Sequence, residues 1–275
     1  MEVIEDRMPE LPEIIVIAEQ MDQILQMKEV DKVSIFQPKC LNRPEKDYCT
    51  YLSGKIVDGV KSLGKWVEMS MNGGDRLLVS LGMGGEILYF EKGHNPPEKS
   101  KFILRFTDGT GFFITLWWFG YFHLVLRNER HPMTDTLGPD PMSLSYENFI
   151  QLFHGRRGAI KSLLLNQKRI RGIGNFYIQE ILYRARLHPL REILSLSKRE
   201  KDRLFQAIRQ VFQESVALGS SSYELDFFGK KGCYGLDQMS IGYRENAVCP
   251  DCNSEIEKIK TGSTTQYICP ECQKL

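Results

Sequence analysis

The stretch MPELPE, residues 8–13, decides how the fold of this chain begins, because it carries the signals of a helix start. Pro12 suits the first position of a helix, where its missing N–H group is no loss. Glu13 places negative charge at the positive end of the helix dipole. Apolar residues then recur at helical spacing, which predicts a helix with one buried face: Ile14, Ile17, Ala18, Met21, Ile24 and Leu25.

Pro9 within this stretch admits two interpretations. Inside a chain the proline nitrogen is an inert amide, whereas at a free N-terminus it is a secondary amine that can attack a sugar aldehyde carbon and form an iminium. The choice depends on whether Met8 is the true start. Residues 1–7, MEVIEDR, precede it and are interpreted as a loose tail or an upstream mis-start. Taken alone, MPELPE favours a simple helix cap.

The bulk properties are those of a soluble, two-domain protein. The chain has 275 residues, of which 42% are hydrophobic and 26% charged, enough for two separate cores. The acidic N-terminus is not followed by an apolar segment, so we expect no signal peptide. No apolar run approaches the length that spans a membrane. Seven cysteines, four of them in two C-x-x-C pairs, suit a reducing cytosol and a metal better than a set of disulfides.

Charge is distributed unevenly along the chain. Between residues 151 and 210, fourteen lysines and arginines face four acidic residues, a net charge of +10 that leaves −9 for the rest of a chain whose total is +1. This asymmetry indicates a basic module for nucleic acid on a neutral to acidic scaffold. A pair of solvated helix faces is the alternative, and charge alone does not exclude it.

The first half of the chain is typical of a β-sandwich or barrel, because many short strands alternate with turns. We expect a strand at 30–37, a loop at 39–46, and strand-like sequence from 54 to 122. Asp108-Gly109 lies between two apolar runs and predicts a hairpin. The expected strands in the second region are 55–60, 66–71, 76–81, 86–90, 102–106 and 111–116.

The second half has a helical period. Residues 127–143 contain three prolines and predict an interdomain linker. Helices are expected at 146–154, 160–167, 176–186 and 197–218. Ser145 and Ser197 are candidate N-caps, and Glu200, three residues after Ser197, fits a capping box.

The last segment carries the most specific motif, two C-x-x-C pairs separated by sixteen residues: Cys249, Cys252, Cys269 and Cys272. Four thiolates on two tight turns form a closed tetrahedral set, which predicts one structural Zn²⁺. Iron in the same cage is the main competitor. The residues between the pairs are expected to form a β-hairpin, and the other three cysteines to be ordinary thiols.

A block at residues 156–189 combines a helix, a basic turn with Gly172 and Gly174, and a second helix that starts near Asn175. Exposed N–H groups at a helix start bind phosphate, and asparagine adds a neutral donor. This block resembles the helix-two-turn-helix element of the formamidopyrimidine-DNA glycosylase / endonuclease VIII family. That family also has an N-terminal proline in a PELPE start, a β-sandwich and a terminal four-cysteine zinc finger, and all four features occur here in the same order.

The resemblance extends from Met8 to about Lys274 and implies an α+β multidomain fold. The expected parts are an N-terminal catalytic β-sandwich domain with a leading helix at 8–126, a linker at 127–143, a helix-two-turn-helix DNA-binding domain at 144–240 and a zinc finger at 241–275. It implies Pro9 as the nucleophile and Glu10 as the acid/base that assists ring opening. It also implies Lys65 as a strand lysine that contacts phosphate beside the lesion.

The resemblance implies further DNA contacts. Met83 matches a wedge that fills the gap left by a flipped base, although by itself it is typical of a core residue. Phe119 matches a second wedge, and Trp118 stands where the family often has an arginine that pairs with the orphaned cytosine. Indole can stack but cannot make the arginine's two-donor contact, so a preference for cytosine opposite the lesion is in doubt. Both residues belong to the aromatic run LWWFG, residues 116–120. The alternative interpretation of this run is a core strand.

The basic module supplies the phosphate contacts that the resemblance implies, through Lys161 and Asn175. Two further departures from the family concern charged or polar positions. The zinc hairpin of the family presents an arginine where this chain has a residue close to Thr264, and loss of that charge would weaken DNA binding. The histidine that precedes Leu-Gly-Met in the family is Ser80 here.

Together these features predict a bifunctional DNA glycosylase / AP lyase of base-excision repair that removes damaged, oxidised bases. The expected partner is double-stranded damaged DNA, with no membrane; we expect a cytoplasmic monomer that associates with the nucleoid through DNA. The alternative is a non-catalytic protein of the same fold that binds damaged DNA. A zinc-ribbon interaction protein without a DNA role is a third hypothesis, which the basic window disfavours. The 220–239 loop lies where the family keeps its base-capping loop.

Overall fold

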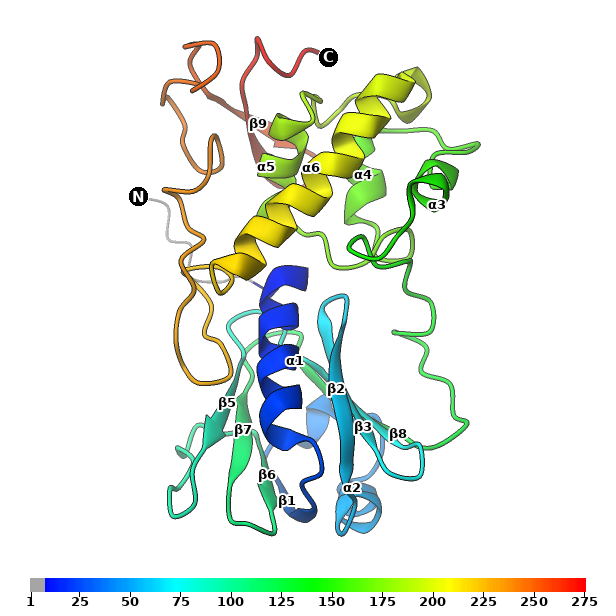
Figure 1. Cartoon of the computed structure of the whole chain (residues 1–275), viewed down its shortest axis with the longest axis vertical. Helices are drawn as coiled ribbons and strands as arrows, with labels where there is room; N and C mark the ends of the chain where they lie inside the picture. The colour runs from blue at the N-terminus through cyan, green and yellow to red at the C-terminus, as the bar shows by residue number, and fades with distance from the viewer. Residues whose placement is uncertain (1–7) are drawn as a thin grey trace. The chain divides into compact units, whose positions relative to one another are not determined.

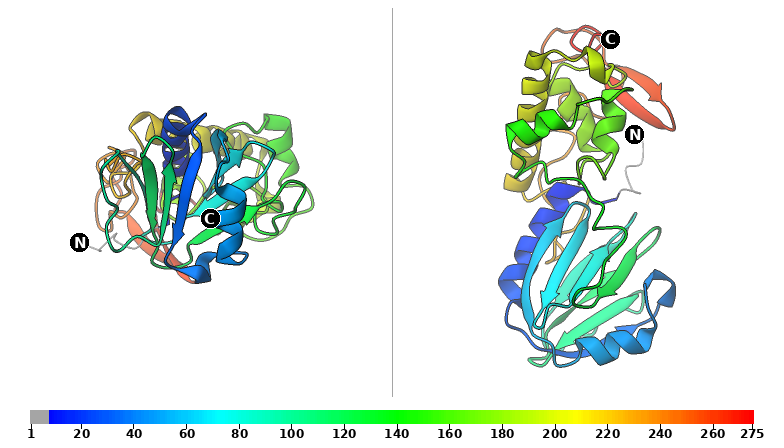
Figure 2. Two further views of the ribbon diagram at one scale, coloured as in Figure 1. Left: turned by 90° about the horizontal axis from the view of Figure 1, so that it is seen from below. Right: turned by 90° about the vertical axis from the view of Figure 1, so that its right-hand side faces the viewer.

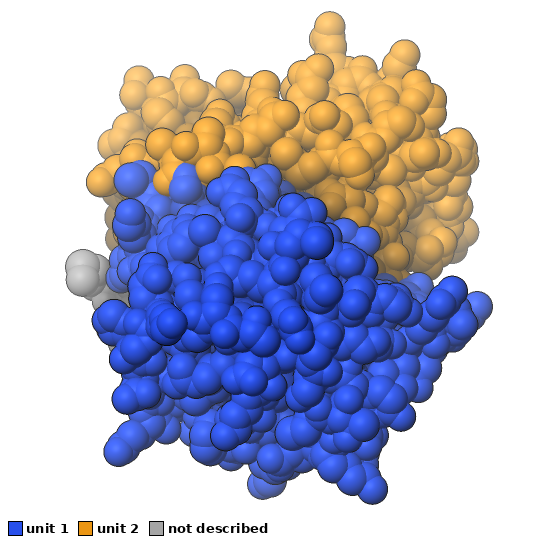
Figure 3. Space-filling model, turned by 60° about the horizontal axis from the view of Figure 1, so that its bottom comes forward, with its two compact units in different colours: residues 1, 3–135, 219–233 blue, residues 2, 136–218, 234–275 orange. Residues whose placement is uncertain are grey.

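A computed structural model describes residues 8–275, so the interpretation of residues 1–7 lies outside the described residues. The chain forms two compact units. The first holds residues up to 135 together with 219–233, and the second holds 136–218 and 234–275 (Figure 3). The segment 219–233 therefore belongs by its contacts to the first unit, although it follows the helices in sequence. The functional domain boundaries given above stay a prediction.

The first unit is a sandwich of two four-stranded antiparallel sheets (Figure 1), as the sequence predicted. One sheet has the order β1-β6-β7-β5 and the other β2-β3-β4-β8. The β6–β7 pair is the hairpin expected at Asp108-Gly109. The strands are β1 (Val30–Ile35), β2 (Val57–Leu63), β3 (Trp66–Met71), β4 (Arg76–Ser80), β5 (Glu86–Phe90), β6 (Phe102–Phe106), β7 (Gly111–Thr115) and β8 (Tyr121–Val125).

The leading helix, α1 (Leu11–Leu25), packs along β2. Pro12 is its second residue, where the missing N–H group is again no loss. The Asp22 side chain accepts a hydrogen bond from the Val60 N–H group at 2.7 Å, so a helix carboxylate satisfies a strand donor. The helix is thereby fixed in register on the sheet.

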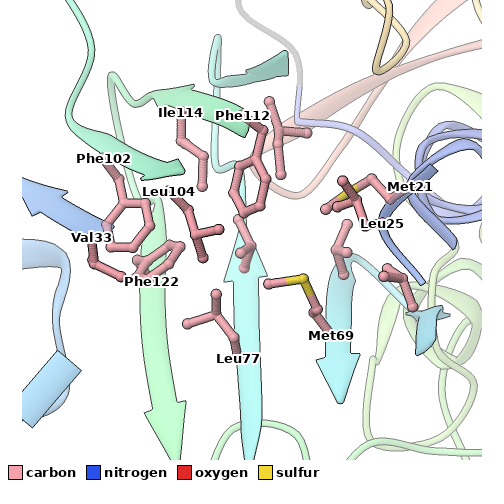
Figure 4. Close-up of a cluster of buried hydrophobic side chains, with 14 of the residues drawn as sticks. Met21, Leu25, Val33, Met69, Leu77, Phe102, Leu104, Phe112, Ile114 and Phe122 are labelled. Atoms are coloured by element: carbon pink, nitrogen blue, oxygen red, sulfur yellow. The ribbon is translucent and has the colours of Figure 1, made fainter. Parts of the chain in front are cut away.

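Apolar side chains from both sheets and from α1 fill the space between the layers (Figure 4). Met21 and Leu25 come from the helix, and aromatic and aliphatic side chains come from the strands. Burial of each large side chain contributes about 1.5–3 kcal/mol. The fully buried strand residues in Figure 4 include Leu77, Phe102, Leu104, Phe112, Ile114 and Phe122.

Three segments of the first unit differ from the sequence-based expectation. The loop expected at 39–46 gives way to a short 3-10 turn (Pro38–Cys40) and a helix, α2 (Glu45–Leu52). This helix buries only Tyr48 and Leu52, one turn apart, so its periodic signal is short. The strand expected at 55–60 runs from Val57 to Leu63, and a further strand, β8, continues past residue 122 to Val125.

The second unit contains four helices and one hairpin within its described residues. Ser145 and Ser197 are N-caps as predicted, and Ser197 forms a capping box with Glu200. Within residues 8–275, no helix combines the length and apolar character needed to cross a bilayer. The elements are α3 (Tyr146–Gln151), α4 (Ile160–Leu165), α5 (Tyr177–Arg184), α6 (Lys198–Ala217), β9 (Glu257–Thr261) and β10 (Thr264–Ile268), with a 3-10 turn at Ile193–Ser195. Figure 2 shows the β9–β10 hairpin in red.

Candidate nucleic-acid interface and metal centre

Pro9 and Glu10 lie immediately before α1, and both are buried. The Glu10 backbone N–H group donates to Glu13 Oε2 at 2.9 Å. The other oxygen of the same carboxylate, Glu13 Oε1, accepts from the Ser221 N–H group at 3.2 Å. One buried side chain therefore joins the start of α1 to the 219–233 segment. This bridge fixes the position of Glu10 and, through the chain, that of Pro9, the residue before it.

Lys65 lies on the turn between β2 and β3, next to Gly64, which has φ +64°. The expectation of a strand position is wrong, because the chain reverses at these two residues. Trp66 anchors the turn from the following position. Its buried ring stacks on Tyr121, with 5.8 Å between centroids, and meets the edge of His131 at 5.4 Å. The half-buried Lys65 thus projects from a rigid support.

Met83 and Trp118 lie directly opposite each other on two adjacent loops, one between β4 and β5 and the other between β7 and β8. The Met83 N–H group donates to Trp118 O at 2.9 Å, and the Trp118 N–H group donates to Met83 O at 3.4 Å. Gly82 makes the approach possible, because an added Cβ would stand 2.0 Å from Trp118 O. The predicted wedge residues therefore belong to one two-loop element.

The aromatic run at the end of this element is exposed. Trp117, Trp118 and Phe119 are 69%, 62% and 65% exposed, and Phe119 has φ +57°. The core-strand alternative for this run is therefore wrong. Met83 is half-buried and does not belong to the core either. Three neighbouring exposed aromatic side chains are unusual for a surface without a partner, and Trp117 is a further candidate that was not selected from the sequence.

Lys161, on α4, is buried and reaches the β9–β10 hairpin of the same unit. Its Nζ donates to Thr261 Oγ1 at 2.6 Å and to Thr264 Oγ1 at 2.5 Å. Burial lowers the pKa of this ammonium to about 8. The two hydroxyls face each other across the ends of β9 and β10. Thr261 could not be selected from sequence, because only the folded hairpin pairs it with Thr264.

Asn175 is exposed and lies two residues before α5. The turn that leads to it is closed by Gln167, which was not anticipated. Its Oε1 accepts from the Gly172 N–H group at 2.7 Å, and its Nε2 donates to Ile173 O at 2.8 Å. One amide side chain thus fixes the glycine turn, and the turn presents Asn175 to solvent.

The four cysteines of the C-x-x-C pairs converge, with their Sγ atoms all within 4.8 Å of one another. The predicted hairpin, β9 and β10, connects the two pairs. Four sulfur ligands at this separation fit a tetrahedral metal ion. Cys40, Cys49 and Cys233 do not take part in this cluster.

The predicted site residues fall into two groups, one on each unit. The structure pairs Met83 with Trp118, places Lys161 on the hydroxyl of Thr264, and gathers the four cysteines. The first unit carries Pro9, Glu10, Lys65, Met83, Trp118 and Phe119, and the second carries Lys161, Asn175 and the cysteines.

In a comparison with known proteins, both halves of the chain match domain models of one family. Residues 8–115 match the model of the formamidopyrimidine-DNA glycosylase N-terminal domain, and residues 137–226 match that of the formamidopyrimidine-DNA glycosylase H2TH domain. The chain is 34% identical to a formamidopyrimidine-DNA glycosylase of Roseiflexus sp. (strain RS-1), over 97% of this chain and 100% of that protein. It is 30% identical to the enzyme of that name from Chloroflexus aurantiacus, over 97% and 98%.

Solved structures of similar proteins have the same fold. The MutM (Fpg) protein of Thermus thermophilus is 27% identical, with a TM-score of 0.84 over 96% of this chain and 98% of that one. Lactococcus lactis Fpg, in complex with DNA that contains N7-benzyl-Fapy-dG, is 24% identical, with a TM-score of 0.88 over 97% and 100%.

The close approach at Gly82 leads to a stability prediction. Gly82→Ala forces a Cβ into Trp118 O, at a position whose left-handed φ of +63° also strains a side chain. Gly93→Ala is the matched control, because Gly93 has φ +86° but nothing within 4 Å of the added Cβ. We expect the control to lose about 1 kcal/mol of unfolding free energy and Gly82→Ala to lose about 1–3 kcal/mol more, measured by urea denaturation. Equal losses would show that the loops are not tightly packed.

Proposed function

Because the chain belongs to the formamidopyrimidine-DNA glycosylase family, we propose that Pro9 and Glu10 perform its chemistry. The protein is a DNA glycosylase of base-excision repair with AP lyase activity. The observation that supports the residue assignment is the fixed position of Pro9-Glu10 at the head of α1, held by the Glu13 carboxylate. The family match begins at residue 8, which suits removal of Met8 to expose the Pro9 amine.

In the proposed reaction the lone pair of the Pro9 nitrogen attacks C1′ of the damaged nucleoside. The glycosidic bond breaks, the Pro9 nitrogen loses its proton, and the base leaves with its electron pair and takes up a proton. The sugar ring opens as the iminium forms, with Glu10 donating a proton to the ring oxygen. Removal of a C2′ proton then expels the 3′ phosphate, and a second elimination expels the 5′ phosphate. Lys65 contacts the phosphate beside the lesion.

The two units supply different proposed contacts with DNA. Met83 and Phe119 fill the gap in the stack, because extrusion of a base costs a few kcal/mol that a wedge recovers in part. Lys161 and Asn175 contact phosphates. Lys161 Nζ lies 2.5 Å from Thr264 Oγ1, so its ammonium remains as a cation beside the position where the arginine's charge is absent.

The four-cysteine cluster is proposed to hold one structural Zn²⁺, through Cys249, Cys252, Cys269 and Cys272. When bound, the ion contributes folding energy to the hairpin and takes no part in the reaction. Because Lys161 donates to Thr261 and Thr264, which flank the turn of this hairpin, a hairpin ordered by the ion also orders the hydroxyls around the lysine.

The partner under this proposal is double-stranded damaged DNA, bound by a cytoplasmic monomer. The relative in the Lactococcus lactis structure is complexed with DNA that carries a modified Fapy-dG, which supports oxidised or ring-opened purines as the substrate class. The non-catalytic binder is not favoured, because the matched relatives are named as glycosylases.

Glu10→Gln tests the proposed chemistry. Glutamine cannot transfer a proton, so we expect the single-turnover rate of base excision to fall about 10²–10⁴-fold, while the affinity for lesion-containing duplex changes less than threefold. Glu19→Gln, at an exposed position of α1, is the matched control and keeps the wild-type rate. Excision at the wild-type rate by Glu10→Gln would remove Glu10 from the mechanism.

Lys161→Met tests the phosphate contact. We expect weaker DNA binding and a salt dependence reduced by about one ion. The wild-type affinity declines as pH rises from 7 to 9, because the free ammonium, with its pKa lowered to about 8, loses the proton that phosphate binding requires. The variant lacks this decline. Fluorescence anisotropy at several salt concentrations and pH values measures both effects, and an unchanged salt slope would contradict the contact.

Metal removal tests the centre. We expect elemental analysis to find one zinc per chain. We expect a chelator to remove the zinc and to lower the DNA affinity at the same time, because the hairpin depends on the ion. Cys269→Ser should lose the metal, whereas Cys49→Ser, at an exposed thiol outside the cluster, should retain it. Full DNA affinity after removal of all zinc would contradict a structural role.

A further inference from the structure

The C-terminal end of α5 lies against the four-cysteine cluster and has no role in the proposals above. Tyr183, in the last turn of this helix, is 4% exposed and packs in a small buried cluster with Cys249 and Cys269. Its hydroxyl oxygen lies 3.3 Å from Cys249 Sγ, a hydrogen-bond distance for sulfur. Phenylalanine would fill the same space, so packing alone does not account for the hydroxyl.

The direction of this hydrogen bond follows from the chemistry of a metal-bound cysteine. Such a cysteine is a thiolate and carries no proton. When the cluster is loaded, the Tyr183 hydroxyl therefore donates and Cys249 Sγ accepts, whereas without a metal either atom can donate. Hydrogen bonds to charged acceptors are stronger than those between neutral groups. The contact thus favours the state of Cys249 that binds a metal ion.

Negative charge accumulates where α5 meets the cluster. Four thiolates outweigh the charge of one divalent ion, and the C-terminal end of a helix adds a partial negative charge. Arg186, two residues beyond the end of α5, brings a cation to this point. Its Nη2 lies 3.1 Å from Asp251 Oδ2, and the guanidinium also interacts with the Cys272 side chain.

The backbone of Arg186 supports a role for its side chain. Its φ is +54°, in the left-handed region that favours glycine. A residue other than glycine in this region carries strain, and such strain persists where the surroundings over-determine the conformation. The contacts of the guanidinium with Asp251 and Cys272 are the surroundings that hold it here.

We propose that Tyr183 and Arg186 set how tightly the four-cysteine cluster retains a thiophilic divalent ion. Tyr183 donates to the Cys249 thiolate, and Arg186 places positive charge beside Cys272. Both stabilise the charged form of a ligand, which is the form that binds metal. This inference rests on the metal centre of the proposed function. Tyr183 also ties the ion to α5, the helix that follows Asn175 and the glycine turn.

The zinc affinity of the whole protein, measured by competition with a chromophoric chelator, tests the hydroxyl. We expect Tyr183→Phe to bind zinc about 10–100-fold more weakly than the wild type, the usual effect of removing a hydrogen-bond partner of a metal ligand. Tyr177→Phe is the matched control. Tyr177 is a fully buried tyrosine of the same helix whose hydroxyl contacts Ser215 Oγ at 2.6 Å, so its loss should leave the zinc affinity unchanged.

Cobalt(II) in place of zinc gives a readout that a merely structural role does not move. Charge transfer from sulfur to cobalt requires less energy when the thiolate is richer in electrons, and a hydrogen-bond donor withdraws electron density from it. We therefore expect the charge-transfer band to move to longer wavelength in Tyr183→Phe and to stay in place in Tyr177→Phe. A loosened fold would weaken metal binding without this shift.

Arg186→Gly tests the charge without adding backbone strain, because glycine adopts φ +54° more readily than arginine. We expect the zinc affinity to fall about two- to fivefold, the range for a charge pair that is half-exposed. Asn128→Gly, at φ +68° in the first unit, is the matched control. It makes the same kind of backbone change far from the cysteines in sequence and should keep the wild-type affinity.

Two results would overturn the role of Tyr183: a zinc affinity of Tyr183→Phe equal to that of the wild type, or an unshifted cobalt band. An unchanged affinity in Arg186→Gly would overturn the role of Arg186. The zinc content of the wild type scores the proposed metal centre separately. A wild type that holds zinc, together with an overturning result, rejects the role of that residue alone. A wild type that holds no zinc rejects the metal centre and this inference together, while strand cleavage at an abasic site still decides the chemistry at Pro9.

Discussion

The buried carboxylate of Glu13 is the interaction on which the proposed site depends. Its two oxygens accept from the Glu10 and Ser221 N–H groups, so it fixes the residue at which α1 begins and ties a distant segment to that point. A buried carboxylate is tolerated only when it is well hydrogen-bonded, and this one is bonded on both sides. Its position sets that of Pro9 and Glu10, and the sandwich beneath α1 holds the helix to which they are attached.

Much of this arrangement could be predicted from sequence, because the responsible signals are local. Strands such as β3, β5 and β6 matched to the residue, since alternating apolar residues and glycine turns bound them. The α2 helix was missed because only Tyr48 and Leu52 mark its buried side. Lys65 was placed on a strand, yet Gly64 turns the chain there. The contact of Lys161 with Thr261 and Thr264 joins residues a hundred positions apart, and only folding brings them together.

Two departures from the family pattern have different physical outcomes. At the hairpin, the position close to Thr264 lacks the arginine's charge, and the Lys161 ammonium, which donates to Thr264 Oγ1, remains as a cation beside it. At the aromatic run, the indole of Trp118 has one N–H donor and cannot make the two-donor contact of an arginine. We therefore propose that a phosphate contact is kept at the hairpin, whereas the two-donor base contact is lost at Trp118. Lysine tolerates such burial because its pKa can fall, whereas arginine stays charged.

The central claim is that the Pro9 amine forms the covalent intermediate. The most direct measurement is borohydride reduction of untagged, natively expressed protein mixed with abasic-site duplex, followed by mass spectrometry of the intact protein and of its peptides. The account predicts a protein that begins at Pro9 and a reduced DNA adduct on the N-terminal peptide. A protein that begins at Met1 and yields no adduct, or an adduct on a lysine peptide, would contradict it.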